Sequence, residues 1–556
     1  MTGSQAAAGT VLFRGCDVID GTGAPRVRAD VAVSGGRISA VGDGARAAAD
    51  GGGGRVIDAS GLVLAPGFID MHAHSDLALL TDERHLAKTA QGVTLEVLGQ
   101  DGLSYAPTDD RTLSQLRRQL AGWNGDPEQL AWDWTTVGGY LDRIDRGSAV
   151  NAAYLVPQGT LRMLCVGNDD RPATPAESAA MRRVLAEGLE QGALGMSSGL
   201  TYPPGMYACT DELVGLCRVV AEYGGYYSPH HRSYGAGALD AYEEMMQIAE
   251  QSGCPVHLTH ATMNFPVNAG RAGDLLELVD DAAARGVDVT MDSYPYLPGA
   301  TTIAALLPSW ASIGGPDELA ARLRDPAARA SITADLEVSG SDGCHGVPID
   351  WSAIQISGVR RPANRALVGL SVAEAAHRAG RAATEFCLDL LLDDDLGTAC
   401  LMHIGHEENV QAIMRHPAHL VGSDGLLAGD RPHPRGWGTF PRYLARYVRE
   451  LGLLTLEECV AKMTGRAARR LGLADRGRIA PGLAADLVLF DPETVVDRAT
   501  FEQPRRTPAG IPYVLVNGEF VIDDEVRTSS LPGRALRRPA RPAPRARNSE
   551  PGGAGR

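Results

Sequence analysis

Short apolar runs broken by turns mark both ends of the chain. Residues 31–33 and 37–41 flank the turn Ser34-Gly35-Gly36, and strand character returns over residues 56–69. Beyond Leu471 it resumes at residues 485–490 and 513–516, the latter before the turn Asn517-Gly518. Such runs, bounded by turn residues, are typical of strands. We therefore expect residues 1–62 and 471–530 to build one small β unit, with a flexible loop tip at the glycine run 51–54.

From Gly67 onward, strand-like runs alternate with helical stretches. This alternation is typical of βαβ units and a parallel sheet, and eight successive units predict an α/β fold of the (β/α)₈ TIM-barrel type. Residues 63–298 hold seven of the strands, and residues 399–470 hold the eighth with the final helices. The eight strands are expected to end near His74, Gly99, Gln158, Ser198, His230, His260, Tyr294 and Asp424.

The interval between the last two barrel strands is too long for one crossover. We interpret residues 299–398 as an inserted lid subdomain over the barrel mouth. Two barrel helices carry start signals, at Thr174-Pro175-Ala176-Glu177 and at Thr455-Leu456-Glu457-Glu458. Residues 531–556 are rich in Pro, Ala, Gly and Arg and are expected to be disordered.

Composition narrows the classes of partner. The chain has 556 residues and a formal charge of −16, which argues against nucleic acid as a ligand. It has neither an apolar run of membrane-spanning length nor a secretory leader at its start, so a cytoplasmic protein is expected. Nine scattered cysteines without a C-x-x-C pair indicate neither a disulfide framework nor a zinc ribbon. The two lysines, Lys88 and Lys462, fit neither a P-loop nor Schiff-base chemistry and are interpreted as helix-surface residues.

Metal-ligand side chains fall at the predicted strand ends. Because barrel active sites assemble from the carboxyl ends of several strands, residues distant in sequence can meet there. Two imidazoles spaced two residues apart share one face of a strand and can reach one ion. The predicted ligand set is His72, His74, Asp101, His230, His260 and Asp424.

Other histidines need a separate interpretation. His231 and His257 alternate away from His230 and His260 on their strands, so at most one of each pair is expected to be a ligand, and we favour His230 and His260. Five histidines nearer the C-terminus lie in predicted helices or loops and are interpreted as surface or capping residues: His403, His406, His416, His419 and His433.

A metal held by imidazoles and carboxylates lowers the pKa of bound water towards about 7, so hydrolysis is the expected reaction. Asp424 is either a ligand or the general base, and Ser423-Asp424-Gly425 also fits a helix cap. Arg435 could bind a substrate carboxylate with its bidentate fork, or could be a solvated side chain.

Five motifs resemble the amidohydrolase superfamily and, within it, the D-aminoacylase (N-acyl-D-amino-acid deacylase) family. They are residues 65–76 around His72 and His74, 192–205, 292–296, 422–425 and 433–435. The resemblance covers nearly the whole folded chain. It implies a barrel with an inserted lid and a β-sandwich made from both chain ends. It also implies one or two zinc ions, with His72 and His74 at one metal position, His230 and His260 at the other, and Asp424 as base. Tyr202, Tyr294 and Arg435 match positions that contact the substrate.

Two departures from that family bear on the substrate and the metal. Asp101 stands where the family has a bridging cysteine, and a carboxylate is harder than a thiolate and less selective for zinc, so another divalent metal is possible. Thr262 stands where the family has a lysine, which removes a cation near the substrate carboxylate.

Three functions are left open. The leading one is hydrolysis of an N-acyl bond on a D-amino acid or a related, less anionic metabolite. Hydrolytic ring opening of a cyclic amide or imide is the second, and a catalytically silent scaffold is the third. The expected partners are a small acylated substrate and further copies of the chain in a homo-oligomer, but neither nucleic acid nor a membrane.

Overall fold

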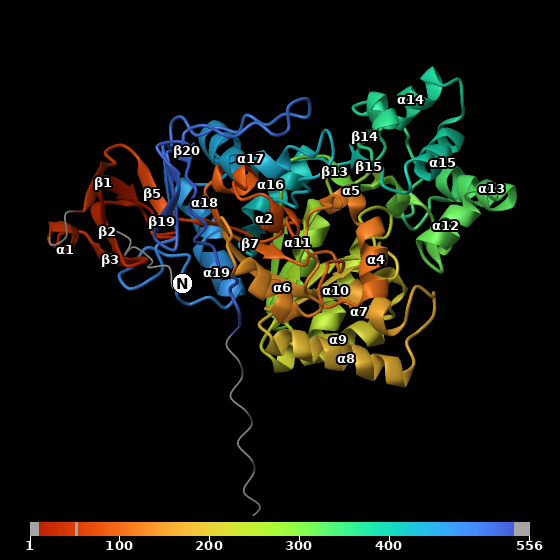
Figure 1. Cartoon of the computed structure of the whole chain (residues 1–556), viewed down its shortest axis with the longest axis horizontal. Helices are drawn as coiled ribbons and strands as arrows, with labels where there is room; N and C mark the ends of the chain where they lie inside the picture. Colours follow the sequence, from red (N-terminus) through yellow and green to blue (C-terminus); the bar gives the residue numbers. More distant parts are fainter. Residues whose placement is uncertain (1–9, 51–53, 539–556) are drawn as a thin grey trace, which may run out of the picture.

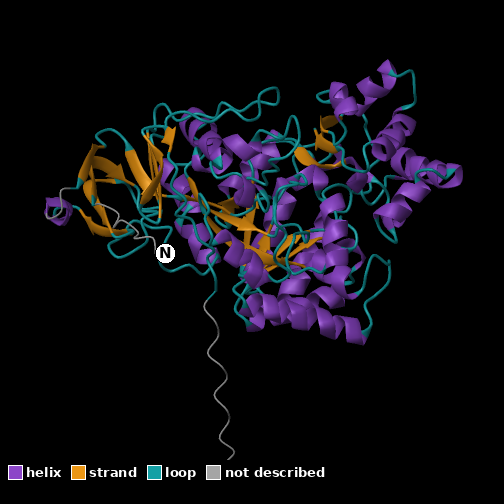
Figure 2. Cartoon of the chain, in the orientation of Figure 1, coloured by secondary structure: helices purple, strands orange, loops and turns teal. Residues whose placement is uncertain are grey.

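The computed structural model describes residues 10–50 and 54–538 and is built around one sheet of eight parallel strands (Figure 2). The strands follow one another in chain order around the sheet. Hydrogen bonds from Met71 N to Val421 O (3.1 Å) and from Asp424 N to His72 O (2.8 Å) join the first strand to the last, so the sheet nearly closes. The predicted (β/α)₈ barrel is confirmed. Its strands are β6 (Phe68–Asp70), β7 (Val93–Leu98), β8 (Asn151–Pro157), β9 (Gly195–Gly199), β10 (Tyr226–His230), β11 (Val256–Leu258), β12 (Val289–Ser293) and β16 (His419–Val421).

Helices surround the barrel, and both predicted helix starts are confirmed. Thr174 caps α8 in a capping box with Glu177, and the Thr455 side chain accepts a hydrogen bond from Glu458 N at the start of α18. The helices of this layer are α2 (Ala78–Thr81), α3 (Leu86–Thr89), α4 (Asp110–Gln119), α5 (Ala121–Asn124), α6 (Val137–Ile144), α7 (Gln158–Cys165), α8 (Pro175–Glu190), α9 (Thr210–Glu222), α10 (Ala238–Ser252), α11 (Ala272–Ala284), α16 (Glu407–Arg415), α17 (Arg435–Arg442), α18 (Leu456–Met463) and α19 (Gly465–Arg470).

A second sheet joins both ends of the chain, as predicted. β5 (Val63–Pro66) pairs with β1 (Val11–Val18) and, antiparallel, with β17 (Leu487–Phe490). β5 lies beyond the expected boundary at residue 62, so the N-terminal part of this unit extends to Pro66. Its remaining strands are β2 (Val27–Ser34), β3 (Arg37–Val41), β4 (Arg55–Asp58), β18 (Tyr513–Val516), β19 (Glu519–Asp523) and β20 (Val526–Arg527).

The insertion between β12 and β16 forms a subdomain with its own apolar core. Its three-stranded sheet has the order β13 (Gly299–Thr302), β15 (Ala399–Met402), β14 (Ile354–Gly358), so it includes β15, which the sequence boundary at residue 398 assigned to the barrel. Figure 1 places this subdomain and the two-ended sheet at opposite ends of the barrel. Its α-helices are α12 (Pro316–Arg322), α13 (Pro326–Ala334), α14 (Val372–Arg378) and α15 (Ala383–Asp393).

The prediction of disorder beyond residue 530 is wrong for residues 531–538. Gly533 N donates to Ser148 O (2.8 Å) and Leu536 N to Ala152 O (2.7 Å), so this segment pairs with the start of β8. Composition could not show this, because the partners of the segment, among them Ser148, Ala152 and Asp145, are distant in sequence. Residues 539–556 and the predicted loop tip at 51–53 lie outside the described residues.

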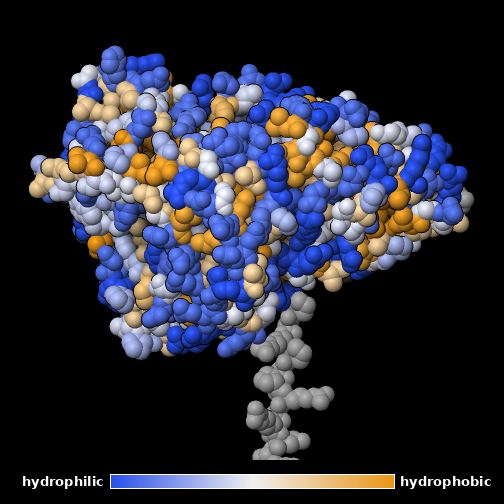
Figure 3. Space-filling view, turned by 180° about the vertical axis from the view of Figure 1, so that it is seen from behind, coloured by the Kyte–Doolittle hydropathy of each residue, from blue (hydrophilic) through white to orange (hydrophobic). Residues whose placement is uncertain are grey.

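The surface seen from behind is largely hydrophilic, with apolar residues in scattered groups (Figure 3). Among the described residues, no helix combines the length and the apolar character needed to cross a bilayer.

Candidate metal centre

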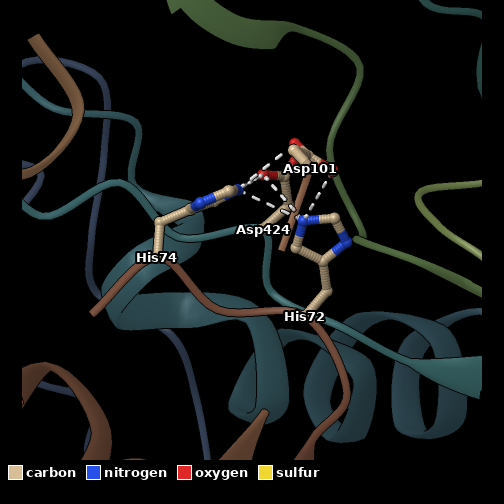
Figure 4. A group of neighbouring side chains, drawn as sticks. All are labelled: His72, His74, Asp101 and Asp424. Atoms are coloured by element: carbon tan, nitrogen blue, oxygen red, sulfur yellow. Dashed lines mark hydrogen bonds and ion pairs between the residues drawn. The ribbon is translucent and has the colours of Figure 1, made fainter. Parts of the chain in front are cut away.

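Four of the six predicted ligands meet where the first, second and eighth strands end (Figure 4). The Nε2 atoms of His72 and His74 are 3.2 Å apart. His74 Nε2 lies 3.4 Å from Asp101 Oδ2 and 3.3 Å from Asp424 Oδ1. Ligand atoms that bind one zinc tetrahedrally at 2.0–2.2 Å lie about 3.3–3.6 Å apart. These separations therefore fit a single bound ion.

A second group shares Asp101 with the first. His230 Nδ1 lies 3.5 Å from Asp101 Oδ2, and His260 Nε2 lies 3.5 Å from Asp101 Oδ1. The two imidazole nitrogens are 3.1 Å apart. Each oxygen of Asp101 thus faces imidazoles of both groups, because Oδ1 also lies 3.5 Å from His72 Nε2. The arrangement has the form of two ion positions bridged by one carboxylate.

The backbone is unusual at three of these residues. Asp101 (φ 53°), His260 (φ 32°) and Asp424 (φ 49°) all adopt left-handed conformations. Non-glycine residues in this region cost about 1–3 kcal/mol each and cluster at functional sites. Gly102 (φ 69°), directly after Asp101, is also required, since a Cβ there would lie 2.4 Å from Gly199 N. The turn after β7 is shaped to aim Asp101 into the cluster.

Three partners that orient the imidazoles were not predicted from the sequence. Asp292 accepts a hydrogen bond from His260 N (2.9 Å) and lies 3.8 Å from His72 Nδ1. Tyr234 Oη is 3.0 Å from His260 Nδ1, and Thr201 Oγ1 is 2.7 Å from His230 Nε2. Such contacts fix the ring orientation of metal-binding histidines. Asp292 ends a barrel strand and so carried a sequence signal, whereas nothing in the sequence marks Tyr234.

Lys88 is not a surface residue, contrary to prediction. Its side chain is fully buried and donates to Asp70 Oδ2 (2.6 Å) and to Ser423 Oγ (2.9 Å), and it lies 3.2 Å from Glu96 Oε1. Asp70 also accepts from Ser423 N (2.8 Å). This network joins the start of the His72 loop to the residue before Asp424. Lys88 is buried because these carboxylates compensate its charge.

Three further residues that were assigned to the surface or to caps are buried. Lys462 is buried and donates to His416 O (2.6 Å), a carbonyl next to the barrel strand β16. His419 lies on that strand, in contact with Ser293 Oγ (2.9 Å). His433 is buried with Nε2 3.0 Å from Pro298 O, and its Nδ1 accepts a hydrogen bond from Arg435 N (3.0 Å), so its predicted capping role is confirmed at the start of α17. Burial of the three side chains depends on partners distant in sequence, which local patterns do not show.

The cluster lies at a cavity of about 590 Å³ between the barrel and the inserted subdomain. Tyr202 and Tyr294 line it, as does Thr262. Arg435 is fully buried behind it, 2.9 Å from Asp424 Oδ2 and with its guanidinium 4.4 Å from the centre of the Tyr294 ring. Apart from this ion pair, the guanidinium nitrogens have no hydrogen-bond partner within the described part of the chain.

The electrostatics of the cluster favour bound cations. Burial alone would raise the pKa of Asp424, but Arg435 and His72 hold that pKa well below its ordinary value. Burial opposes a charge on His74, yet contacts with Asp101 and Asp424 outweigh it and raise the pKa of His74 to about 10. As far as the structure describes the chain, Asp101 Oδ1 has no hydrogen-bond partner although it is buried. Two ionised carboxylates among four imidazoles are a donor set that suits divalent metals.

Comparison with known proteins gives consistent matches over nearly the whole chain. Residues 55–522 match the model of the amidohydrolase family. An N-acyl-D-glutamate deacylase of Alcaligenes xylosoxydans xylosoxydans is 38% identical over 531 residues, which cover 95% of this chain and 97% of that protein.

Two solved structures agree with this match. The crystal structure of N-acyl-D-glutamate deacylase from Bordetella bronchiseptica, complexed with zinc and a phosphonate inhibitor that mimics the tetrahedral intermediate, has a TM-score of 0.80 at 35% identity, with 95% of this chain and 99% of that chain covered. A D-aminoacylase structure that addresses the role of a binuclear metal centre has a TM-score of 0.79 at 34% identity, with 96% and 100% covered.

Proposed function

This chain belongs to the amidohydrolase family and, within it, to the D-aminoacylases, and we propose that it is a metal-dependent hydrolase that cleaves the N-acyl amide bond of an N-acyl-D-amino acid or a related acylated metabolite. One observation carries the proposal: a single carboxylate, Asp101, faces four imidazoles and the carboxylate Asp424 beside a cavity. A silent scaffold would not require strained backbone at three of these residues.

His72, His74 and Asp424 would hold one divalent ion, His230 and His260 a second, and Asp101 both. The zinc complex of the Bordetella bronchiseptica deacylase supports zinc as the metal. A divalent ion bound here supplies Lewis-acid polarisation of the amide carbonyl and lowers the pKa of a bound water. Asp292, Tyr234 and Thr201 contact His260 and His230 and would keep their imidazoles aimed at the ions.

Asp424 is the proposed proton-transfer residue. Its low pKa keeps it ionised, so it is ready to accept a proton from the attacking water. It would then return that proton to the amide nitrogen as the C–N bond breaks, so that the amine leaves neutral. The position of Arg435, 2.9 Å from Asp424 Oδ2, fixes the direction of the carboxylate.

We assign the amino-acid end of the substrate to the side of Arg435 and Tyr294. The guanidinium of Arg435 forms an ion pair with Asp424 through Nη2, and its other nitrogens, which have no hydrogen-bond partner among the described residues, would attract the substrate carboxylate. Tyr202 would contact the substrate from the opposite wall. Within the described chain, no lysine or arginine lines the cavity itself, and Thr262 occupies its wall. The lack of a lysine or arginine in the lining is the specific observation that keeps ring opening of a cyclic amide as the second function.

A substrate panel separates the two functions. Metal-loaded protein is assayed on N-acetyl derivatives of several D-amino acids, on their L enantiomers and on hydantoin-type rings. The proposal predicts turnover of the D series in preference to both other sets. Turnover confined to the rings would replace it with the second function. A cytoplasmic location and assembly into a homo-oligomer remain predictions.

A further inference from the structure

A second cavity adjoins the one at the metal centre. It spans about 730 Å³, part of it open to solvent, between the barrel helices α4 and α5 and the inserted subdomain. Tyr202 and Ala305 line both cavities, so the two spaces meet at these residues.

Single aromatic rings, those of Trp123 and Tyr202, separate the second cavity from the metal centre. The ring of Trp123 lies edge-on to His74, with 5.1 Å between ring centres, and edge-on to Tyr202 at 4.9 Å. Tyr202 in turn packs against His230 at 4.8 Å. The second cavity therefore begins beside the ligands, whereas Arg435 lies against Asp424 on the side proposed for the amino-acid end.

The lining of the second cavity is largely apolar. Its charged residues are Arg118 and Asp395, whose side chains are 32% and 43% exposed and lie 3.2 Å apart. Arg118 also pairs with Asp317 (2.8 Å), so its charge is already compensated and offers little to an anion. The residues that form the apolar lining are Leu103, Leu120, Trp123, Ala304, Leu319 and Leu396.

Hydrolysis of an N-acyl bond places two groups on opposite sides of the reacting carbonyl, the amine part and the acyl part. With the amine part directed to Arg435 and Tyr294, the acyl part points to Tyr202 and Trp123. Building on the proposed function, we propose that the second cavity is an acyl subsite. It would take an uncharged hydrocarbon acyl group that is longer than acetyl, either a medium-length aliphatic chain or an arylalkyl chain. The subsite would make the enzyme selective for the acyl group as well as for the amino acid.

The wild-type enzyme gives the first test. The kcat/KM is measured for acetyl, butyryl, hexanoyl and octanoyl derivatives of one D-amino acid. Each methylene that enters an apolar site gains up to about fourfold, from about 0.8 kcal/mol per buried CH₂. We expect kcat/KM to rise at least tenfold from acetyl to octanoyl. A flat or falling series would overturn the acyl subsite and leave the proposed function standing, whereas hydrolysis of no member would reject both.

Filling the cavity gives the second test. Ala304→Phe places a ring in the apolar lining and should lower the octanoyl-to-acetyl ratio of kcat/KM at least tenfold. Ala321→Phe, at an exposed alanine of α12 that does not line the cavity, is the matched control and should keep the wild-type ratio. Ser312→Phe, at another lining position, repeats the test if Ala304→Phe does not fold. Equal ratios in wild type and in a folded cavity variant would contradict the assignment.

Discussion

At the scale of single residues, the site depends most on Asp101, since its two oxygens face all four imidazoles. A carboxylate is harder than a thiolate, so this position sets metal preference as well as affinity. Its left-handed backbone, next to Gly102, shows that the loop is shaped around it.

Replacing Asp101 tests this assignment. Asp101→Cys should shift the preference for zinc over manganese at least tenfold towards zinc, because thiolate is the softer ligand. Asp101→Ala should lose the second ion and weaken the first. Metal content after equilibration with both ions measures the effect. Asp110→Cys, at an exposed position on α4, is the control for adding a cysteine away from the site. Wild-type affinity for two ions in Asp101→Ala would disprove bridging.

Replacing Asp424 tests its assignment as the proton-transfer residue. Asp424→Asn keeps an oxygen towards the metal but cannot accept a proton, so kcat should fall by about 10²–10⁴. Metal content and kcat are measured on the same sample. A variant that keeps both its metal and its turnover would rule out the assigned proton transfer.

Glu96 gives a prediction for pH. Burial would raise its pKa, but Lys88 and His85 outweigh burial and lower the pKa from 4.5 to about 2. Between these values the unfolded chain binds more protons, so the stabilisation is complete above pH 4.5 and is lost as the pH falls through about 2. Over this pH range the contribution of Glu96 to the free energy of unfolding changes by about 3 kcal/mol.

Urea unfolding of metal-free protein between pH 2 and 5.5 measures this. The free energy of unfolding should depend less steeply on pH in Glu96→Gln than in wild type, and Glu525→Gln, at an exposed glutamate, should follow wild type. Parallel curves for Glu96→Gln and wild type would be inconsistent with the compensated charge.

The candidate site shows which residues a sequence can reveal. His72, His74, Asp101 and Asp424 combined a ligand-type side chain with a strand end, and both signals are local. Lys88, by contrast, is buried only because Asp70 and Glu96 compensate its charge, and such pairing follows from tertiary packing.

At the scale of elements, the C-terminal segment 531–538 is part of the folded molecule. It pairs with the start of β8, Ala535 is buried, and Arg537 forms ion pairs with Asp142 (2.7 Å) and Asp145. The barrel strands were predictable because buried parallel strands are continuous apolar runs. This segment was not, because its Pro, Ala, Gly and Arg residues resemble a linker.

Truncation tests the role of this segment. A chain ending at Ser530 loses several backbone hydrogen bonds of about 1 kcal/mol each and should melt a few degrees below a chain ending at Arg538. The Tm of the two truncated chains is compared by calorimetry at equal metal loading. Identical Tm values would show that the segment adds nothing to stability.

At the scale of the whole molecule, the chain forms three structural units with different positions relative to the metal centre. The barrel supplies the ligands, the inserted subdomain completes both cavities, and the sheet from both chain ends stands at the opposite end of the barrel (Figure 1). The insertion was predictable from its length, but its boundary was not, because β15 pairs with β13 and β14, far away in sequence.

Metal titration of the metal-free enzyme tests the central claim most directly. Protein stripped with a chelator is titrated with zinc while hydrolysis of an N-acyl-D-amino acid is followed. If the metal centre is catalytic, we expect no hydrolysis without zinc and an activity that appears as the metal positions fill. His72→Ala should not recover activity at the same zinc concentrations. Full hydrolysis by the metal-free protein would contradict the account.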